Sequence, residues 1–581
     1  MWLMRNIFSL SALVLAVCSP LQAQTKLAVV PAFNRPLNAA MAVGVINPAM
    51  NLLPQSCLMT GAPSFVQSAM PLAAVMTPAA PAVKKSALLT AKKNLINAAV
   101  KTEPQSSSSA SFDGTAAKPA KGVSADWVRS MIEKDEAVDG KSRRMRDVVQ
   151  RLGFSQAALN RGILAQHNDN YTVDLSRGPI TDQKNSGRCW IFAGLNMVRS
   201  MMIADNEKLK NLELSENYLH FFNMLEKSNS QLEGVVEKIY KPTGKISSYE
   251  RHETVIPKIG DGGWYEFFAF LVTKYGMVPK SAMPETISSE ATAVLLKELD
   301  ASLAATAAQM IANAKLYKAG HSANLSREIK ERGMARVWSI LATHLGDPPK
   351  SIEYRTNGKS VVVRGVKTTP TRVTSMTPQE FAKNVAKFNP SDYVSIASYP
   401  EKKINEVYEV PKSAIGAAKP GEPKFDLRFM NVTSERMEQL AAAALKGGQP
   451  VWFAADVSQD VDRKTGIMHP QIFDRDPVYQ FSQEAQVPPL TRKQNSYFRQ
   501  TSANHAMLLT GYDRPRANGP IVKFKVENSW SDVTGDKGIY HMYHDWFMQY
   551  VFEIVVHKKF LTAAERARFA GKAVRTREDG F

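Results

Sequence analysis

The chain has 581 residues, a formal net charge of +19 at pH 7 and a pI of about 9.5. Hydrophobic residues make up 44% and charged residues 22%, which is ordinary for a globular protein with a well-buried core. Its three cysteines exclude a disulfide scaffold, and its basic charge, without an arginine-rich stripe interleaved with aromatics, does not indicate nucleic-acid binding.

The N-terminus predicts a secretory signal peptide over residues 1–23. One basic residue precedes an apolar run over 7–17, and small residues provide a cleavage site after Ala23. The run is shorter than the roughly 20 residues that cross a bilayer, so we expect no transmembrane anchor. Lipidation of Cys18 is disfavoured, because Val17 is bulkier than the small residue that normally precedes a lipidated cysteine. The sequence therefore predicts an exported protein, either periplasmic or secreted.

Composition divides the rest of the chain. Residues 24–122 are rich in Ala, Pro, Val, Met and Ser and end in low-complexity sequence, which predicts a largely disordered linker or pro-segment. Globular patterning begins at about residue 123, where Ser124 precedes apolar residues at helical spacing. The densest basic cluster has the pattern of the solvated face of a helix and comprises Lys141, Arg143, Arg144, Arg146 and Arg151. Nucleic acid is therefore not an expected partner.

Helical patterns dominate the first part of this globular region and strand-like patterns the second. Residues 190–204, 214–226 and 264–275 predict helices, and the Ala- and Leu-rich stretch 287–345 predicts a further helical segment. The strand-like runs that follow are SVVVRGV, QPVWFAADV, HAMLLTGYD, IVKFKVENSW and YVFEIVVHKK. This order predicts an α+β protein with one largely helical half and one largely β half.

Cys189 is a candidate nucleophile. With Cys18 in the predicted signal peptide, the mature chain keeps only Cys57 and Cys189. Loop-forming residues precede Cys189 and a buried-helix pattern follows it, so we expect it at the N-terminus of a helix. Unpaired amide donors and the positive end of the helix dipole stabilise a thiolate there. The alternative is a buried structural cysteine, the commonest fate of a free thiol.

A histidine, an asparagine and a glutamine could complete a reaction centre around Cys189. His505 opens an extended apolar run, and Asn528, 23 residues later, ends another. The asparagine oxygen could accept the imidazole N–H and leave the other ring nitrogen for the thiol. Trp530 could shield that hydrogen bond from water, and Gln183 could join the Cys189 amide in holding an oxyanion.

These residues and their surroundings resemble papain-like cysteine peptidases (clan CA, family C1), and more narrowly the bleomycin hydrolase or aminopeptidase C branch. The form S-G-R-C-W, found here at 186–190, is typical of that branch. Further matching motifs follow in order through about residues 124–560: L-S-E-N-Y (214–218), D-G-G-W (261–264), K-Y-G-M-V-P-K (274–280), P-V-W-F (450–453), D-R-K-T-G-I-M (462–468), N-H-A (504–506), E-N-S-W (527–530) and V-V-H-K-K (555–559).

The resemblance implies a two-lobed papain-like fold over residues 123–560, with a helical lobe, a β-barrel-like lobe and large helical insertions, one of them at about 287–345. These insertions account for the long separation of cysteine and histidine. It also implies thiol-dependent hydrolysis of peptide bonds through a thioester, with release of N-terminal residues. Gly262 and Gly263 would then pair with the substrate backbone. Peptides or proteins are the expected substrates, and a homo-hexamer is the expected assembly.

The C-terminal arm, residues 561–581, departs from the branch that the chain resembles. In that branch the arm lies in the active-site cleft, and its terminal carboxylate meets the free amino group of the substrate. The usual Pro-Trp-Asp-Pro-type ending is absent here. We favour an aminopeptidase, and two alternatives stay open. One is an endopeptidase with an open cleft, kept latent by residues 24–122; the other is a non-catalytic basic binding protein on a peptidase scaffold.

The sequence predicts neither a cofactor nor a metal site. His541 and His544 stand three residues apart, a spacing that can hold a metal ion on a helix. Tyr540 and Tyr543 beside them indicate a strand-to-turn segment instead, which disfavours this pair as a helical metal site.

Overall fold

The computed structural model describes residues 122–136, 140–175, 177–239, 258–316, 319–357, 361–364, 366–369, 371–411, 425–479 and 488–576. The chain divides into two units, Met1–Cys57 and Leu58–Phe581, and every described residue belongs to the second. The predicted signal peptide, and all of the predicted linker except Gly122, lie outside the described residues.

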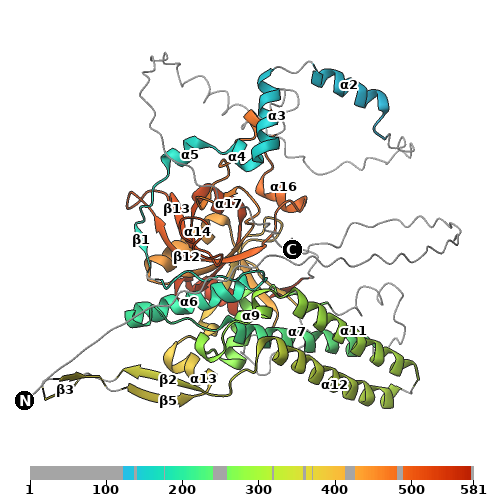
Figure 1. The fold of residues 1–581 in the computed structure, drawn as a ribbon, viewed down its shortest axis with the longest axis vertical. Helices are drawn as coiled ribbons and strands as arrows, with labels where there is room; N and C mark the ends of the chain where they lie inside the picture. The colour runs from blue at the N-terminus through green and yellow to red at the C-terminus, as the bar shows by residue number, and fades with distance from the viewer. Residues whose placement is uncertain are drawn as a thin grey trace, which may run out of the picture. The chain divides into compact units, whose positions relative to one another are not determined.

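Long helices form the helical half that the sequence predicts. The helices are α2 (Ala125–Glu136), α3 (Gly140–Leu152), α4 (Phe154–Ala158), α5 (Arg161–Gln166), α6 (Cys189–Asp205), α7 (Glu216–Ile239), α9 (Tyr265–Tyr275), α10 (Ile287–Glu290), α11 (Ala293–Leu316), α12 (Ala319–Leu345), α13 (Pro378–Glu380), α14 (Ser434–Lys446), α15 (Asp476–Tyr479), α16 (Arg492–Tyr497), α17 (His544–Tyr550) and α18 (Ala563–Ala570). Helices α7, α11 and α12 pack against one another, and α9 lies against α7 (Figure 1). Helix α7 runs well beyond the predicted 214–226, because Leu232 and Val235 continue its buried face.

The described chain contains sixteen strands, of which the four within residues 352–376 form two separate two-stranded sheets and the others form the β half. The strands are β1 (Val173–Asp174), β2 (Ile352–Asn357), β3 (Val361–Val363), β4 (Val366–Thr368), β5 (Thr371–Met376), β6 (Tyr393–Ala397), β7 (Val407–Val410), β8 (Leu427–Asn431), β9 (Val451–Ala455), β10 (Val461–Asp462), β11 (Ile467–Met468), β12 (His505–Asp513), β13 (Lys523–Glu527), β14 (Ile539–Tyr543), β15 (Val551–His557) and β16 (Val574–Arg575). The predicted run SVVVRGV is split into β3 and β4, since Arg364 takes a positive φ of 52° and turns the chain.

Twelve of these strands share one sheet. Its order is β10-β11-β14-β13-β12-β9-β15-β6-β8-β7-β16, and β1 pairs with β12. All nine residues of β12 are buried, and His505 at its start lies opposite Ala455 of β9. Successive side chains alternate between two cores: Ala506 belongs to the core shared with the helical half, and Met507 to the core beneath α14 and α17.

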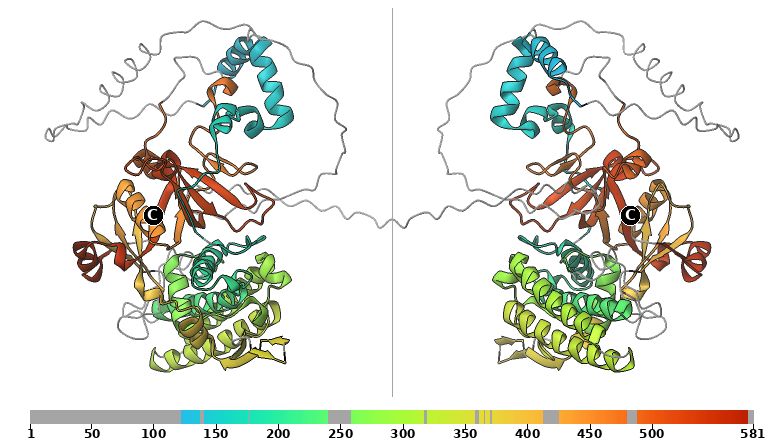
Figure 2. Two further views of the ribbon diagram at one scale, coloured as in Figure 1. Left: turned by 90° about the vertical axis from the view of Figure 1, so that its left-hand side faces the viewer. Right: turned by 90° about the vertical axis from the view of Figure 1, so that its right-hand side faces the viewer.

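Helix α6 lies between the two halves. It contacts β9 and β12 on one side and α7 and α9 on the other. Figure 2 shows the green helices and the orange to red strands on opposite sides of it. The predicted α+β organisation, with a helical half and a β half, is confirmed, and the interface between the halves brings the start of α6 to the start of β12.

The N-terminal helices are largely exposed. Helix α2 begins after Ser124, whose Oγ accepts a hydrogen bond from the Trp127 amide at 3.1 Å. Helix α3 carries the basic cluster and has no buried residue, as expected of a solvated face. Among the described residues, no helix has both the length and the apolar character needed to cross a bilayer.

The described part of the C-terminal arm lies along the last strands of the sheet. Helix α18 begins with a capping box between Thr562 and Glu565. The guanidinium of Arg436 donates from Nε and Nη2 to the two carboxylate oxygens of Glu565, at 2.8 and 2.9 Å. Strand β16 then pairs in parallel with β7, separated from β12 by β9, β15, β6, β8 and β7. Residues 577–581 of the predicted arm lie outside the described residues.

Candidate active site

Cys189 is the first residue of α6. Thirteen of the 17 residues of this helix are buried, in agreement with the apolar pattern that predicts a buried helix. The carbonyl of Arg188, the N-cap, accepts hydrogen bonds from the amides of Ile191 at 2.9 Å and Phe192 at 3.1 Å. The first-turn amides have no partner within the helix, so they and the helix dipole favour negative charge beside the half-buried Cys189 thiol.

His505 and Asn528 lie at adjacent ends of two neighbouring strands. Because β12 and β13 are antiparallel, the residue that starts β12 meets the residue that follows β13. His505 Nε2 lies 2.8 Å from Asn528 Oδ1, and both residues are buried. The same oxygen accepts a hydrogen bond from the Ser529 amide at 2.8 Å, which identifies it as the acceptor. Nε2 therefore carries the proton, and Nδ1 of the neutral ring keeps its lone pair.

An aromatic side chain covers His505. The indole of Trp530 stacks on the imidazole with ring centroids 4.5 Å apart and an interplanar angle of 25°. The guanidinium of Arg463 lies over the same indole, 4.7 Å from its centroid. Trp530 is thus positioned to limit the access of water to the imidazole.

Gln183 is held in one orientation from both ends of its amide. Nε2 donates to the Ser186 carbonyl at 2.7 Å, and Oε1 accepts from Ser529 Oγ at 2.7 Å. The backbone amide of Gln183 also donates to the Ser529 carbonyl at 2.9 Å. Since a carbonyl can only accept a hydrogen bond, the side-chain amide atom that faces the Ser186 carbonyl must be the nitrogen, Nε2. This nitrogen carries a second N–H that can donate to an oxyanion.

Asp261 ties the glycine loop before α9 to the start of α6. Its Oδ2 accepts from the Gly187 amide and from Thr292 Oγ1, each at 2.6 Å. Its backbone carbonyl accepts from Trp190 Nε1 at 2.9 Å. Burial alone would raise the pKa of Asp261, but the hydrogen bonds from Thr292 and Gly187 hold it below its usual value. An ionised carboxylate therefore fixes the loop beside Cys189.

The two glycines of this loop, Gly262 and Gly263, have different surroundings. A Cβ at Gly263 would lie 2.5 Å from the Trp190 indole, whereas no heavy atom lies within 4 Å of a Cβ at Gly262. Gly262 is exposed, and its carbonyl accepts a hydrogen bond from Lys227 Nζ. Close packing therefore requires glycine at 263, while Gly262 borders open space, as a substrate contact would.

We expect Gly263→Ala to lower the free energy of unfolding by about 1–3 kcal/mol, because Trp190 is fully buried and a methyl group would overpack it. The matched control Gly262→Ala should stay within about 0.5 kcal/mol of the parent. Urea denaturation measures both values. Equal destabilisation by the two substitutions would contradict the packing described here.

Burial acts against charge on both candidate catalytic groups. It raises the pKa of the Cys189 thiol to about 11, although the backbone N–H of Ala506 counteracts it. It also lowers the pKa of His505 to about 4, against the effect of the Asn528 hydrogen bond. A proton that moves from the sulfur to the ring creates two opposite charges together, and their attraction offsets the cost of burial. The Ala506 contact places the sulfur beside the residue that follows His505.

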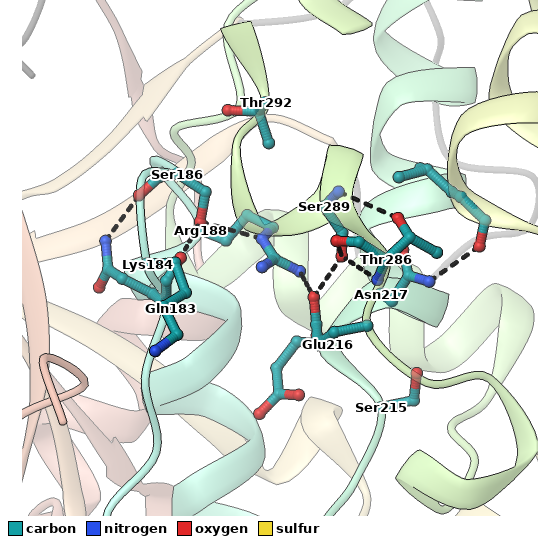
Figure 3. A network of polar contacts seen from close by, with 12 residues as sticks. Gln183, Lys184, Ser186, Arg188, Ser215, Glu216, Asn217, Thr286, Ser289 and Thr292 are labelled. Atoms are coloured by element: carbon teal, nitrogen blue, oxygen red, sulfur yellow. Dashed lines mark hydrogen bonds and ion pairs between the residues drawn. The ribbon is translucent and has the colours of Figure 1, made fainter. Parts of the chain in front are cut away.

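Arg188 anchors the loop before Cys189 from the side of the helical half. It is fully buried, its Nη1 lies 2.8 Å from Glu285 Oε2, and its Nε donates to Ser186 Oγ at 3.0 Å. Ser186 Oγ in turn donates to the Gln183 carbonyl at 2.6 Å. Figure 3 shows Arg188 between this loop and Glu216, the first residue of α7.

Arg188, Asp261 and Ser529 support the predicted site, yet sequence spacing alone does not single them out. Their contacts join residues 97, 74 and 346 positions apart, which no local pattern reveals. The motifs S-G-R-C-W, D-G-G-W and E-N-S-W contain all three and are the signal that could have found them.

Comparison with known proteins extends over nearly all of the described chain. Residues 123–576 match the model of the Peptidase C1-like family. Aminopeptidase G of Lactobacillus delbrueckii subsp. lactis is 31% identical over 428 residues, which cover 73% of this chain and 91% of that protein. Aminopeptidase C of Streptococcus thermophilus is 30% identical over 452 residues, which cover 77% and 95%.

A solved structure shows the same fold. The crystal structure of PepW from Lactobacillus rhamnosis matches with a TM-score of 0.66 at 28% identity, covering 78% of this chain and 97% of that one. This likeness confirms the predicted papain-like α+β fold. The matched residues and the coverage of the relatives also confirm the predicted enzyme class, a cysteine-type peptidase: the chain belongs to the peptidase C1-like family.

Proposed function

We propose that the protein is a thiol-dependent aminopeptidase in which Cys189, His505 and Asn528 act as the catalytic triad. The observation that carries this proposal is the 2.8 Å contact between His505 Nε2 and Asn528 Oδ1, with the oxygen identified as the acceptor. It orients a neutral imidazole with an unprotonated Nδ1, the form that a general base requires. The names of the relatives, aminopeptidase C and aminopeptidase G, support exopeptidase action.

The mechanism follows from the position of each group. The Cys189 sulfur transfers its proton to His505 and attacks the scissile carbonyl carbon. Gln183 Nε2 and the Cys189 amide stabilise the oxyanion of the tetrahedral intermediate. His505 then protonates the leaving amine as the C–N bond breaks, which leaves a thioester on Cys189. His505 next takes a proton from a water molecule that attacks the thioester, and hydrolysis restores the thiol.

We expect the enzyme to cleave a fluorogenic peptide with a free N-terminus and to leave its N-acetylated counterpart intact. An aminopeptidase recognises the charged amino group, which acetylation removes. The two peptides carry the same scissile residue and are assayed under reducing conditions. Cleavage of both at similar rates would contradict exopeptidase action while leaving the peptidase assignment in place.

A second candidate, an endopeptidase, is favoured by one observation: residues 561–581 contain no Pro-Trp-Asp-Pro-type segment of the kind found in the branch that the chain resembles. A chain ended after Thr576 tests it, since the described α18 and β16 remain in that chain. An endopeptidase cleaves the acetylated peptide both as the full chain and as the shortened chain. An aminopeptidase whose last five residues select free amino groups cleaves it only after the shortening.

Export and assembly are two further proposals. We propose that residues 1–23 direct export and are removed after Ala23, as their charged, apolar and small-residue segments support. N-terminal sequencing of the exported protein should then begin at Gln24. We also propose a homo-hexamer, on the resemblance to the aminopeptidase C branch, and light scattering of the purified protein measures the number of chains.

A further inference from the structure

Two histidines and two aspartates that the proposed mechanism does not use lie together between the segment before β1 and strand β14. His167 Nε2 lies 3.1 Å from Asp169 Oδ1, and His541 Nε2 lies 3.9 Å from the same oxygen. Asp536 Oδ2 lies 3.7 Å from His541 Nε2. One ligand atom from each of His167, Asp169 and His541 falls within 4.8 Å of the other two.

These separations suit a four-coordinate metal ion. Zn²⁺ binds imidazole nitrogens and carboxylate oxygens at about 2.0–2.2 Å, which puts neighbouring ligand atoms of a tetrahedron roughly 3.3 Å apart. The contacts to Asp169 and Asp536, between 3.1 and 3.9 Å, lie on both sides of that value. The ligand atoms of His167, Asp169 and His541 lie within 4.8 Å of one another, so the exposed side chains of Asp169 and Asp536 would have to rotate toward the two rings to reach coordinating distance.

The second observation is a buried ring nitrogen without a partner. The His541 side chain is 2% exposed, and its Nε2 makes no hydrogen bond. Such an atom is rare in a folded protein and calls for an explanation. Because the atom is directed at the carboxylates of Asp169 and Asp536, a cation between them would satisfy it.

The other nitrogen of each ring already has an oxygen partner. His541 Nδ1 lies 2.5 Å from the Tyr171 hydroxyl, and His167 Nδ1 lies 3.1 Å from the Tyr543 hydroxyl. An Nδ1–H that donates to such an oxygen leaves the Nε2 lone pair free to bind metal, and histidine ligands commonly have an outer partner of this kind.

We propose that His167, Asp169 and His541, with Asp536 as the fourth ligand, bind one Zn²⁺ ion. Imidazole and carboxylate ligands suit zinc, and two neutral rings with two carboxylates leave the occupied site without net charge. The inference is independent of the peptidase proposal, because among the described residues no hydrogen bond or ion pair joins these four to Cys189, His505 or Asn528.

Two neighbouring lysines do not cancel the attraction of the four-residue cluster for a cation, since each lysine has an acidic partner of its own. Lys523 Nζ is buried and lies 3.3 Å from Asp513 Oδ2, and it also donates to the Asn170 carbonyl at 2.9 Å. Lys525 Nζ lies 2.6 Å from Asp174 Oδ2. The carboxylates of the cluster therefore remain to balance a divalent ion.

The ion would join two segments that are far apart in the chain. His167 and Asp169 lie between α5 and β1, and Asp536 belongs to the loop that connects Asn528 to β14. A ligand that binds only the folded state raises its stability. Zinc should therefore raise the melting temperature of the protein, and chelation should reverse the rise.

The test uses the full chain with Cys189→Ala, which removes the candidate catalytic thiol as a competing ligand. Chelator-treated protein is titrated with ZnCl₂ in competition with a chromophoric chelator, and bound zinc is counted by elemental analysis. We expect one ion per chain. Asp169→Asn should weaken the affinity at least about 10-fold, since even outer-sphere changes cost that much. Asp532→Asn, an exposed residue of the same loop, is the matched control and should bind as the parent does.

Folding does not confound this comparison, because the Asp169 side chain is 73% exposed and asparagine has the same shape. Co²⁺ in place of zinc should give the strong visible absorption of a tetrahedral site in the parent and in Asp532→Asn, and lose it in Asp169→Asn. Zinc bound with equal affinity by the parent and Asp169→Asn, or no bound zinc in the parent, would overturn the proposal.

Discussion

Alanine in place of Cys189 should lower kcat/KM for a free-amine peptide by at least about 10⁴-fold, the scale on which removal of a catalytic nucleophile acts. The reason is chemical: without the sulfur no thioester forms, and the imidazole of His505 has no partner to activate. Alanine fits the half-buried position, so the far-ultraviolet circular dichroism spectrum should not change.

The control for this substitution is the other cysteine of the predicted mature chain. Cys57→Ala should keep the parent's activity and its inactivation by iodoacetamide, because Cys57 lies outside the matched residues 123–576. Activity in Cys189→Ala above about one-hundredth of the parent, far above the loss expected for a triad, would exclude Cys189 as the nucleophile.

Arg188→Met should lower the free energy of unfolding by about 3–5 kcal/mol, the usual cost of leaving one partner of a buried ion pair alone. The Glu285 side chain is 13% exposed and would lose its 2.8 Å contact with the guanidinium. Ser186 Oγ would lose a hydrogen bond as well, and with it part of the support of the loop before Cys189. Urea denaturation measures the stability. The value of kcat/KM, measured at urea concentrations below the unfolding transition, shows whether the loop before Cys189 still supports activity.

Two further variants distinguish the loss of the Arg188–Glu285 ion pair from the loss of side-chain packing. Arg188→Met with Glu285→Gln should recover part of the lost stability, because no buried charge is then left unpaired. Arg151→Met removes an exposed ion pair to Asp147 and should cost less than about 1 kcal/mol. If Arg188→Met costs no more than Arg151→Met, the buried pair does not stabilise the protein.

Patterns local in sequence predicted much of the fold. The apolar stretch after Cys189 predicted α6, and the Ala- and Leu-rich stretch 287–345 predicted α11 and α12, because helix periodicity repeats every few residues. The same holds for the candidate site: His505 and Asn528 stand at the ends of strand-like runs, and antiparallel pairing of those runs brings them within hydrogen-bonding distance.

Contacts between distant segments could not be predicted in this way. His541 and His544 are candidates for a metal-binding pair because they are close in sequence. However, His541 lies in β14, where positions three apart face opposite sides, and His544 begins α17. The ring beside His541 belongs instead to His167, with centroids 4.3 Å apart. Only the folded sheet, with β1 laid against β12 and β14 against β13, brings these residues together.

The pairing of β16 with β7 has a consequence for how the protein can be shortened or fused. An uncovered outermost strand offers a row of free amide and carbonyl groups to any other chain, and this is a common start of aggregation. Residues 574–575 occupy that row along β7, and Arg428 beside them donates to the Gly571 carbonyl at 2.7 Å. We therefore expect proteolysis that removes the tail to expose the edge of β7 and to favour precipitation, even though the candidate catalytic residues remain intact.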